Sequence, residues 1–148
     1  MIAVHINMDN FTLNERMAGF ISPEGQGDML RAVSLSMLPV VHDRIHVEGK
    51  AADGSRIGTY SKSYLKYTRP KFNRSTDPKV ILSLTRQMEN DFSVVAASGK
   101  YGLGFKNDLH FDKATWLEGT YSKKIYGLTG GERDLAITAA QEYTDGIL

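Results

Sequence analysis

The spacing of apolar residues near the start of the chain predicts one strand followed by a loop. Ile2, Val4 and Ile6 alternate with smaller or polar residues, which is the period of a strand with one buried face. The segment 9–26 carries asparagine, glycine and proline around a short apolar run at 17–21. We therefore expect a loop there, with at most one helical turn.

The clearest helix is predicted for residues 28–48. Asp28 suits its N-cap position, and Gly49 suits its end. Pro39 falls opposite the apolar side, so it is compatible with one kinked helix or with two short helices that meet there. The apolar side recurs at spacings of three and four residues and consists of Leu30, Val33, Met37, Val41 and Ile45.

The middle of the chain predicts a second helix and a hairpin. Polar residues and a proline at 75–78 form a helix-start signal before a helix over about 79–92. Two short β-rich runs, 93–97 and 101–105, lie on either side of a Ser-Gly-Lys turn and predict the hairpin. The expected apolar face of the helix consists of Ile81, Leu84, Met88 and Phe92.

Two further helices are expected at about 111–121 and 131–147. In the first, Ala114 and Leu117 should face inward and Trp116 should be half-buried. In the second, the apolar side should consist of Leu135, Ala136, Ile137, Ala139 and Tyr143. Strands and helices do not alternate in a βαβ rhythm. We predict an α+β fold with helices packed on a small antiparallel sheet, in a single domain over 1–148.

Composition narrows the class of protein. The 148 residues are 41% hydrophobic and 24% charged, which fits one globular domain. The chain has no cysteine, which excludes disulfides, thiolate nucleophiles and zinc–thiolate sites. No segment approaches the roughly 20 apolar residues of a membrane helix, and the start lacks the features of a signal peptide. We expect folding in a cytosol and no membrane partner.

Candidate metal-binding groups are few. His42 and His46 are four residues apart, so they share a helix face and could share a metal ion. Asp43 stands where the metalloprotease pattern has a glutamate, and the pair still needs a third ligand, which only His5, His110 or a carboxylate could supply. We interpret the two as half-exposed helix histidines.

Other patterns also have structural explanations. The glycines at 99–104 match neither the P-loop nor the dinucleotide fingerprint, and they suit a hairpin. Glu132 and Asp134 complement the dipole at the start of the last helix. We therefore expect a protein that is not an enzyme and has no catalytic residues, no metal and no cofactor.

The segment at about 56–74, which we call the basic arm, has the most distinctive composition. It contains six basic residues and no acidic residue, with aromatic residues between them, and helical spacing would place a tyrosine stripe beside a basic stripe. Its functional interpretation is contact with phosphates, by binding nucleic acid or by lining a passage for DNA. The alternatives are a solvated loop whose tyrosines pack on the core and a surface that meets an acidic partner subunit. The candidate contact residues are Arg56, Tyr60, Lys62, Tyr64, Lys66, Tyr67, Arg69, Lys71 and Arg74.

Several short motifs follow one another in an order found in a known family. They are Arg44-Ile45-His46-Val47-Glu48-Gly49 at a helix end, Asp53-Gly54, Tyr60-Ser61-x-x-Tyr64, Val80-Ile81-Leu82-Ser83-Leu84-Thr85-Arg86-Gln87-Met88, Gly102-Leu103-Gly104-Phe105-Lys106-Asn107, Ala114 with Trp116, and Lys124-Ile125-Tyr126-Gly127-Leu128-Thr129 before Glu132. In this order, over roughly residues 28–145, the chain resembles the virion-morphogenesis and tail-completion proteins of tailed bacteriophages.

The resemblance implies a structural role in the virion. Such a protein would be a subunit of the head–tail neck, forming a homo-oligomeric ring between the head-side connector and the tail proteins. It would be assembled in the host cytoplasm and would contact DNA only as the DNA passes. In that setting we expect the basic arm to become ordered only on assembly. The competing hypothesis is a nucleic-acid-binding module that acts through the same segment.

Overall fold

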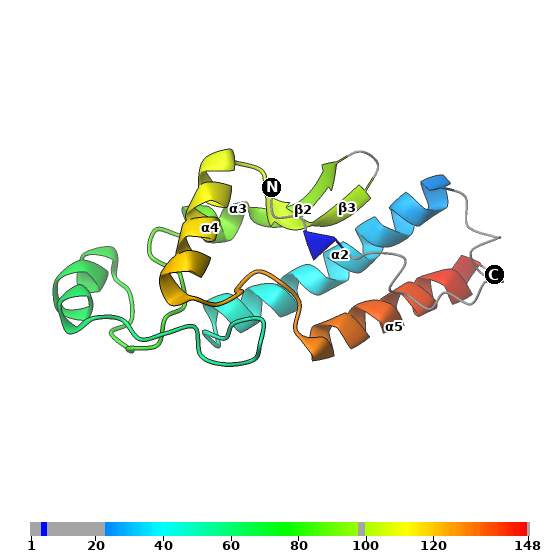
Figure 1. The fold of residues 1–148 in the computed structure, drawn as a ribbon. Helices are drawn as coiled ribbons and strands as arrows, with labels where there is room; N and C mark the ends of the chain where they lie inside the picture. Colours follow the sequence, from blue (N-terminus) through cyan, green and yellow to red (C-terminus); the bar gives the residue numbers. More distant parts are fainter. Residues whose placement is uncertain (1–3, 6–22, 98–99, 148) are drawn as a thin grey trace.

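One long helix organises the molecule. The computed structural model describes residues 4–5, 23–97 and 100–147. Helix α2 runs along the body, with the strands on one side and the last helix on the other (Figure 1). In chain order the elements are β1 (Val4–His5), α2 (Pro23–His46), η2 (Tyr64–Thr68), η3 (Arg69–Phe72), α3 (Gln87–Asp91), β2 (Phe92–Ala97), β3 (Lys100–Phe105), α4 (Asp108–Tyr121) and α5 (Gly130–Ile147).

The sheet is small and antiparallel, which confirms the predicted α+β fold. β2 and β3 form the expected hairpin, in which Val94 lies opposite Leu103. β1 pairs with the other edge of β3, with Val4 also opposite Leu103, so the strand order is β1-β3-β2. The predicted first strand is thus confirmed at Val4–His5. Of the loop predicted over 9–26, residues 9–22 lie outside the described residues, and residues 23–26 belong to the first turn of α2 instead. Leu103 is buried at the centre of the sheet against α2.

Helix α2 is a single helix with the predicted buried side. It begins at Pro23 rather than at Asp28, because proline is well suited to a first helical turn, where its missing N–H costs no hydrogen bond. The helix continues through Pro39, which is exposed, so the alternative of two short helices is wrong. All of the predicted stripe is buried: Leu30, Val33, Met37, Val41 and Ile45.

A glycine allows the chain to turn sharply after α2. Gly49 has a φ of 67°, in the left-handed region that favours glycine. A Cβ atom at this position would lie 2.6 Å from the carbonyl oxygen of Val80. Gly49 is therefore required both for its backbone conformation and for the close approach of the segment around Val80, which packs against the end of α2.

The predicted helix over 79–92 is largely wrong. Only Gln87–Asp91 is helical, and Leu82 and Arg86 have positive φ values of 50° and 65°. The residues just before Leu82 run beside the start of the basic arm. The N–H of Tyr60 donates to the carbonyl oxygen of Pro78, and the N–H of Val80 donates to that of Gly58. Long-range hydrogen bonds thus replace the local ones that a helix would have made.

Two predictions about the last helices also need correction. Trp116 on α4 is 70% exposed rather than half-buried, whereas Ala114 is fully buried as expected. On α5, Leu135 is 53% exposed, and the buried residues are Glu132, Ala136, Ala140 and Thr144. The buried face of α5 is thus displaced from Leu135, because close packing of α5 against α2 favours alanine at the contact.

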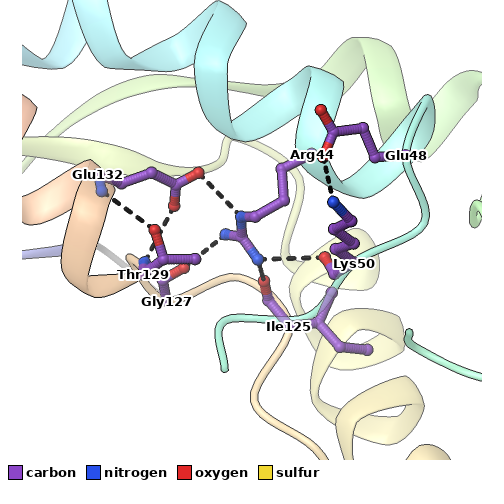
Figure 2. A network of polar contacts seen from close by, with 7 residues as sticks. All are labelled: Arg44, Glu48, Lys50, Ile125, Gly127, Thr129 and Glu132. Atoms are coloured by element: carbon purple, nitrogen blue, oxygen red, sulfur yellow. Dashed lines mark hydrogen bonds and ion pairs between the residues drawn. The ribbon is translucent and has the colours of Figure 1, made fainter. Parts of the chain in front are cut away.

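A buried ion pair joins α2 to α5 (Figure 2). The Nε atom of Arg44 donates to Oε2 of Glu132 at 2.9 Å, and both side chains are 6% exposed. Oε1 of Glu132 accepts from the N–H of Thr129, whose Oγ1 accepts from the N–H of Glu132, a reciprocal capping box. Glu132 therefore does more than complement the helix dipole, and the Thr-x-x-Glu spacing was the sequence signal for it.

Candidate interaction surface

The basic arm leaves the body at the end opposite to the C-terminal end of α5 (Figure 1). Residues 62–72 form helical turns, which include a π-helical turn, η2, and a 3₁₀ turn, η3. The predicted tyrosine stripe beside a basic stripe is wrong, because Tyr60 precedes these turns and Arg69 is buried whereas Lys66 is exposed. The arm has this conformation within a single chain, held by the intrachain hydrogen bonds described next. The expectation that the arm becomes ordered only on assembly stays a prediction.

Arg69 anchors the arm to the body instead of facing outward. Its side chain is buried, with 1% exposed. Nε donates to the carbonyl oxygen of Ser75 at 2.7 Å, and Nη1 donates to that of Ser83 at 3.0 Å. The guanidinium also lies 4.8 Å from the ring centroid of Tyr60, a cation–π contact. Arg69 was a candidate contact residue, and the structure gives it this internal role.

Tyr60 and Arg74 complete the anchor. The phenolic oxygen of Tyr60 accepts from the N–H groups of Ile81 and Leu82, each at 3.2 Å, and burial raises the pKa of Tyr60. Nε of Arg74 donates to the carbonyl oxygen of Leu84 at 2.7 Å. The arm therefore satisfies the backbone polar groups of the segment that was predicted to be a helix, which explains why that segment stays extended.

The remaining cations of the arm face solvent. Arg56, Lys62, Lys66 and Lys71 are exposed, and among the ion pairs of the described residues only Arg56 has a carboxylate nearby, Asp77 at 4.0 Å. Two aromatic side chains accompany them, since Tyr67 is 60% exposed and Phe72 is 44% exposed. The ammonium of Lys66 lies 5.1 Å from the ring centroid of Tyr67, while Tyr64 is half-buried with its ring centroid 4.9 Å from that of Tyr60. The exposed surface of the arm is thus both basic and aromatic.

A cleft of about 510 Å³ separates the base of the arm from α4. The arm, the non-helical segment around residue 82 and α4 all contribute to its walls, so sequence reasoning could not have found it. Its lining is mainly aromatic and aliphatic and includes Tyr60, Tyr64, Leu82, Met88, Leu117 and Tyr121. Trp116 also belongs to this lining, which places the most exposed aromatic side chain of α4 beside the arm.

The two helix histidines occupy different environments. His42 is about one-third exposed, and its Nε2 lies 3.1 Å from Oε1 of Glu89. His46 is buried, with 5% exposed, so its interpretation as half-exposed is wrong. Its Nδ1 contacts the carbonyl oxygen of Ile81 at 2.9 Å. Burial lowers the pKa of His46, against the raising effects of the Ile81 carbonyl and of Glu89.

The described residues form neither a metal-binding cluster nor a membrane-spanning helix. Within residues 4–5, 23–97 and 100–147, no group of three or more histidine, aspartate or glutamate side chains could hold a metal ion. The helices described in the same ranges are too short or too polar to span a bilayer. Comparison with protein families, with curated proteins and with solved structures finds no match to this chain. The function is consequently proposed from the surface described above and from the order of motifs in the sequence.

Proposed function

We propose that this chain is a structural subunit of the head–tail neck of a tailed bacteriophage, of the tail-completion type. In this role it assembles with copies of itself into a ring between the head-side connector and the tail. The order of motifs along residues 28–145 supports the proposal, since it resembles that family. The observation that carries it is the outward surface of the arm, on which cationic and aromatic side chains are exposed together.

The aromatic side chains of the arm are of the kind found in protein interfaces. Aromatic and cationic side chains such as Tyr67, Phe72 and Lys66 are exposed together, and aromatic residues are enriched at protein interfaces. Arg69 and Arg74 bond the arm to backbone carbonyl oxygens, and a surface held in place before docking loses less entropy when it docks. An anchored arm with exposed apolar rings gains free energy when a partner covers it, at roughly 25 cal/mol per Å² of apolar surface.

The proposal is tested in the virion itself. Mass spectrometry of purified particles should find this chain at a few copies per particle. When assembly takes place without it, heads and tails should remain unattached to each other. Lys66→Glu on the arm should reduce tail attachment, whereas Lys124→Glu, which changes an exposed lysine outside the arm, should not. Absence of the chain from purified, infectious particles would contradict the proposal.

A nucleic-acid-binding module is the second candidate function. The exposed cations Lys62, Lys66 and Lys71, with Tyr67 beside them, could contact phosphates and stack on bases. Fluorescence anisotropy with double- and single-stranded DNA tests this candidate. With three phosphate contacts, binding should weaken by roughly 20- to 40-fold between 50 and 200 mM salt, and each lysine replaced by alanine should reduce the salt slope by about 1. Absence of binding at low salt would exclude this function.

A further inference from the structure

The outward face of α5 carries charge of the opposite sign to the arm. From residue 134 to the end of the chain there are three acidic residues, Asp134, Glu142 and Asp145, and neither lysine nor arginine. With 3.6 residues per helical turn, these three positions fall within an arc of about 80° on α5. All three are exposed, while Ala136 and Ala140 on the other side of the helix are buried. The face away from α2 is therefore an acidic stripe.

Helix stability accounts for Asp134, which lies near the start of α5, but not for Glu142 and Asp145. The C-terminal end of a helix has a partial negative charge, so carboxylates there are unfavourable and cations are favourable. Glu142 and Asp145 lie near that end, and the last turn of α5 contains no basic residue. The six ion pairs among the described side chains also leave Asp134, Glu142 and Asp145 without a cation. A cation from outside the chain would relieve this unfavourable arrangement.

The basic arm has matching unpaired charges. Lys62, Lys66 and Lys71 are exposed and belong to none of the same ion pairs. The two surfaces also resemble each other in apolar content, since Tyr67 and Phe72 are exposed on the arm and Leu135 is exposed beside the acidic stripe. Charge and apolar surface are thus complementary between the arm and α5.

The two surfaces cannot meet within one chain. Figure 1 shows the arm at one end of an elongated molecule and the C-terminal end of α5 at the other. When two complementary surfaces lie apart on one subunit, contact between copies is heterologous, and repeated contact closes a ring or extends a filament. We propose that the basic arm of each copy docks on the acidic stripe of α5 of the next copy, which is the contact that closes the ring in the proposed function on which this inference rests.

A protein partner explains the arm better than DNA does. Arg69 is buried and Arg74 is bonded to a backbone carbonyl, so two of the six arm cations are already engaged. The exposed ring of Phe72 and that of Tyr67 would gain from an apolar neighbour such as Leu135. A second copy supplies that neighbour and the acidic stripe together.

Charge exchange between the two surfaces tests the inference. The first variant, Lys62→Glu/Lys66→Glu/Lys71→Glu, reverses the arm, and the second, Asp134→Lys/Glu142→Lys/Asp145→Lys, reverses the stripe. At a concentration where the native chain is oligomeric, light scattering after size exclusion should show only monomer for each variant alone. The concentration at which half of the chains are assembled should be roughly a hundredfold or more higher for each variant than for the native chain. An equimolar mixture of the two variants should assemble again, because each arm then faces a stripe of opposite charge. Lys124→Glu is the control and should assemble like the native chain.

Cross-linking gives a second measurement that needs only single replacements on each surface. The native chain has no cysteine, so Lys66→Cys/Glu142→Cys introduces one thiol on the arm and one on the stripe. Under mild oxidation we expect disulfide-linked ladders of several copies. The matched variant Lys124→Cys/Glu142→Cys should give few cross-links beyond those of random collision.

The outcomes separate this inference from the proposed function. A native oligomer that persists in both charge-reversed variants and gives no arm-to-stripe cross-link would overturn the inference and leave the neck assignment standing. Loss of DNA binding in the arm variant with an unchanged oligomer would also overturn it and would assign the arm to nucleic acid. A native chain that stays monomeric at every concentration and is absent from particles would overturn both.

Discussion

The buried ion pair between α2 and α5 should be the most sensitive polar element of the fold. Arg44 donates to Oε2 of Glu132 at 2.9 Å and to the carbonyl oxygens of Lys50, Ile125 and Gly127 at 3.2, 3.0 and 2.6 Å (Figure 2). The replacement Arg44→Met keeps much of the side-chain volume but removes every one of these donors. Glu132 would then be a buried carboxylate whose only remaining partner in the network is the N–H of Thr129.

The expected loss follows from this burial. Breaking a buried ion pair by removing one partner costs about 3–5 kcal/mol, because the other charge stays desolvated. For a chain near 150 residues, each kcal/mol lowers the melting temperature by about 2–4 °C, so Arg44→Met should lower it by roughly 6–20 °C. Adding Glu132→Gln should recover part of the loss, because the orphaned charge disappears while a carbonyl oxygen can still cap Thr129.

Urea unfolding followed by circular dichroism measures these differences, with Lys50→Met as the matched control. The side chain of Lys50 pairs with Glu48 at 3.3 Å, but both are about half exposed, so this surface pair should contribute less than about 1 kcal/mol. The Lys50 carbonyl that accepts from Arg44 is unaffected by the control. If Arg44→Met cost no more than Lys50→Met, the network would not hold α5 to α2, and the reasoning would be refuted.

Three further predictions concern the backbone, the pH dependence and the arm. Gly49→Ala should destabilise the fold by more than about 2 kcal/mol, because the position has a positive φ and a Cβ would meet a carbonyl oxygen. Gly54→Ala, also at positive φ but in open space, should cost about 1 kcal/mol. Equal losses in urea unfolding would show that the clash with the carbonyl oxygen does not contribute. Burial lowers the pKa of His46 in the folded chain, so as the pH falls the imidazole takes up a proton first in the unfolded chain. The contribution of His46 to the free energy of unfolding should therefore be complete above about pH 6.5 and should be lost as the pH drops through the folded pKa. The loss should be at most about 1.4 kcal/mol per pH unit. His46→Gln should make the measured stability less dependent on pH over that interval, and an unchanged profile would count against the burial effect. Arg69→Met should accelerate hydrogen exchange in residues 59–84 while leaving the sheet protected, since two carbonyl oxygens lose their donor; unchanged exchange would show that Arg69 does not anchor the arm.

Local patterns were sufficient to predict most of the helices, the hairpin and the α+β class. The stripe from Leu30 to Ile45 marked α2, because a side chain every three or four residues must face the same way whatever it packs against. The hairpin was equally accessible, since two β-rich runs around a short glycine turn have few other arrangements. The basic and aromatic composition of the arm and its helical spacing were also visible in the chain itself.

Contacts between distant segments decided the rest. The segment after Pro78 has a helical apolar pattern, yet Tyr60, Arg69 and Arg74 satisfy its backbone groups and hold it extended. Those same contacts decide which cations of the arm face solvent, so composition alone could not separate Arg69, which is buried, from an exposed lysine such as Lys66. The spacing of apolar residues indicates which side of an element is buried. The hydrogen-bond partner of a side chain depends instead on which backbone group from a distant segment comes within about 3 Å. Only the folded chain brings those atoms together.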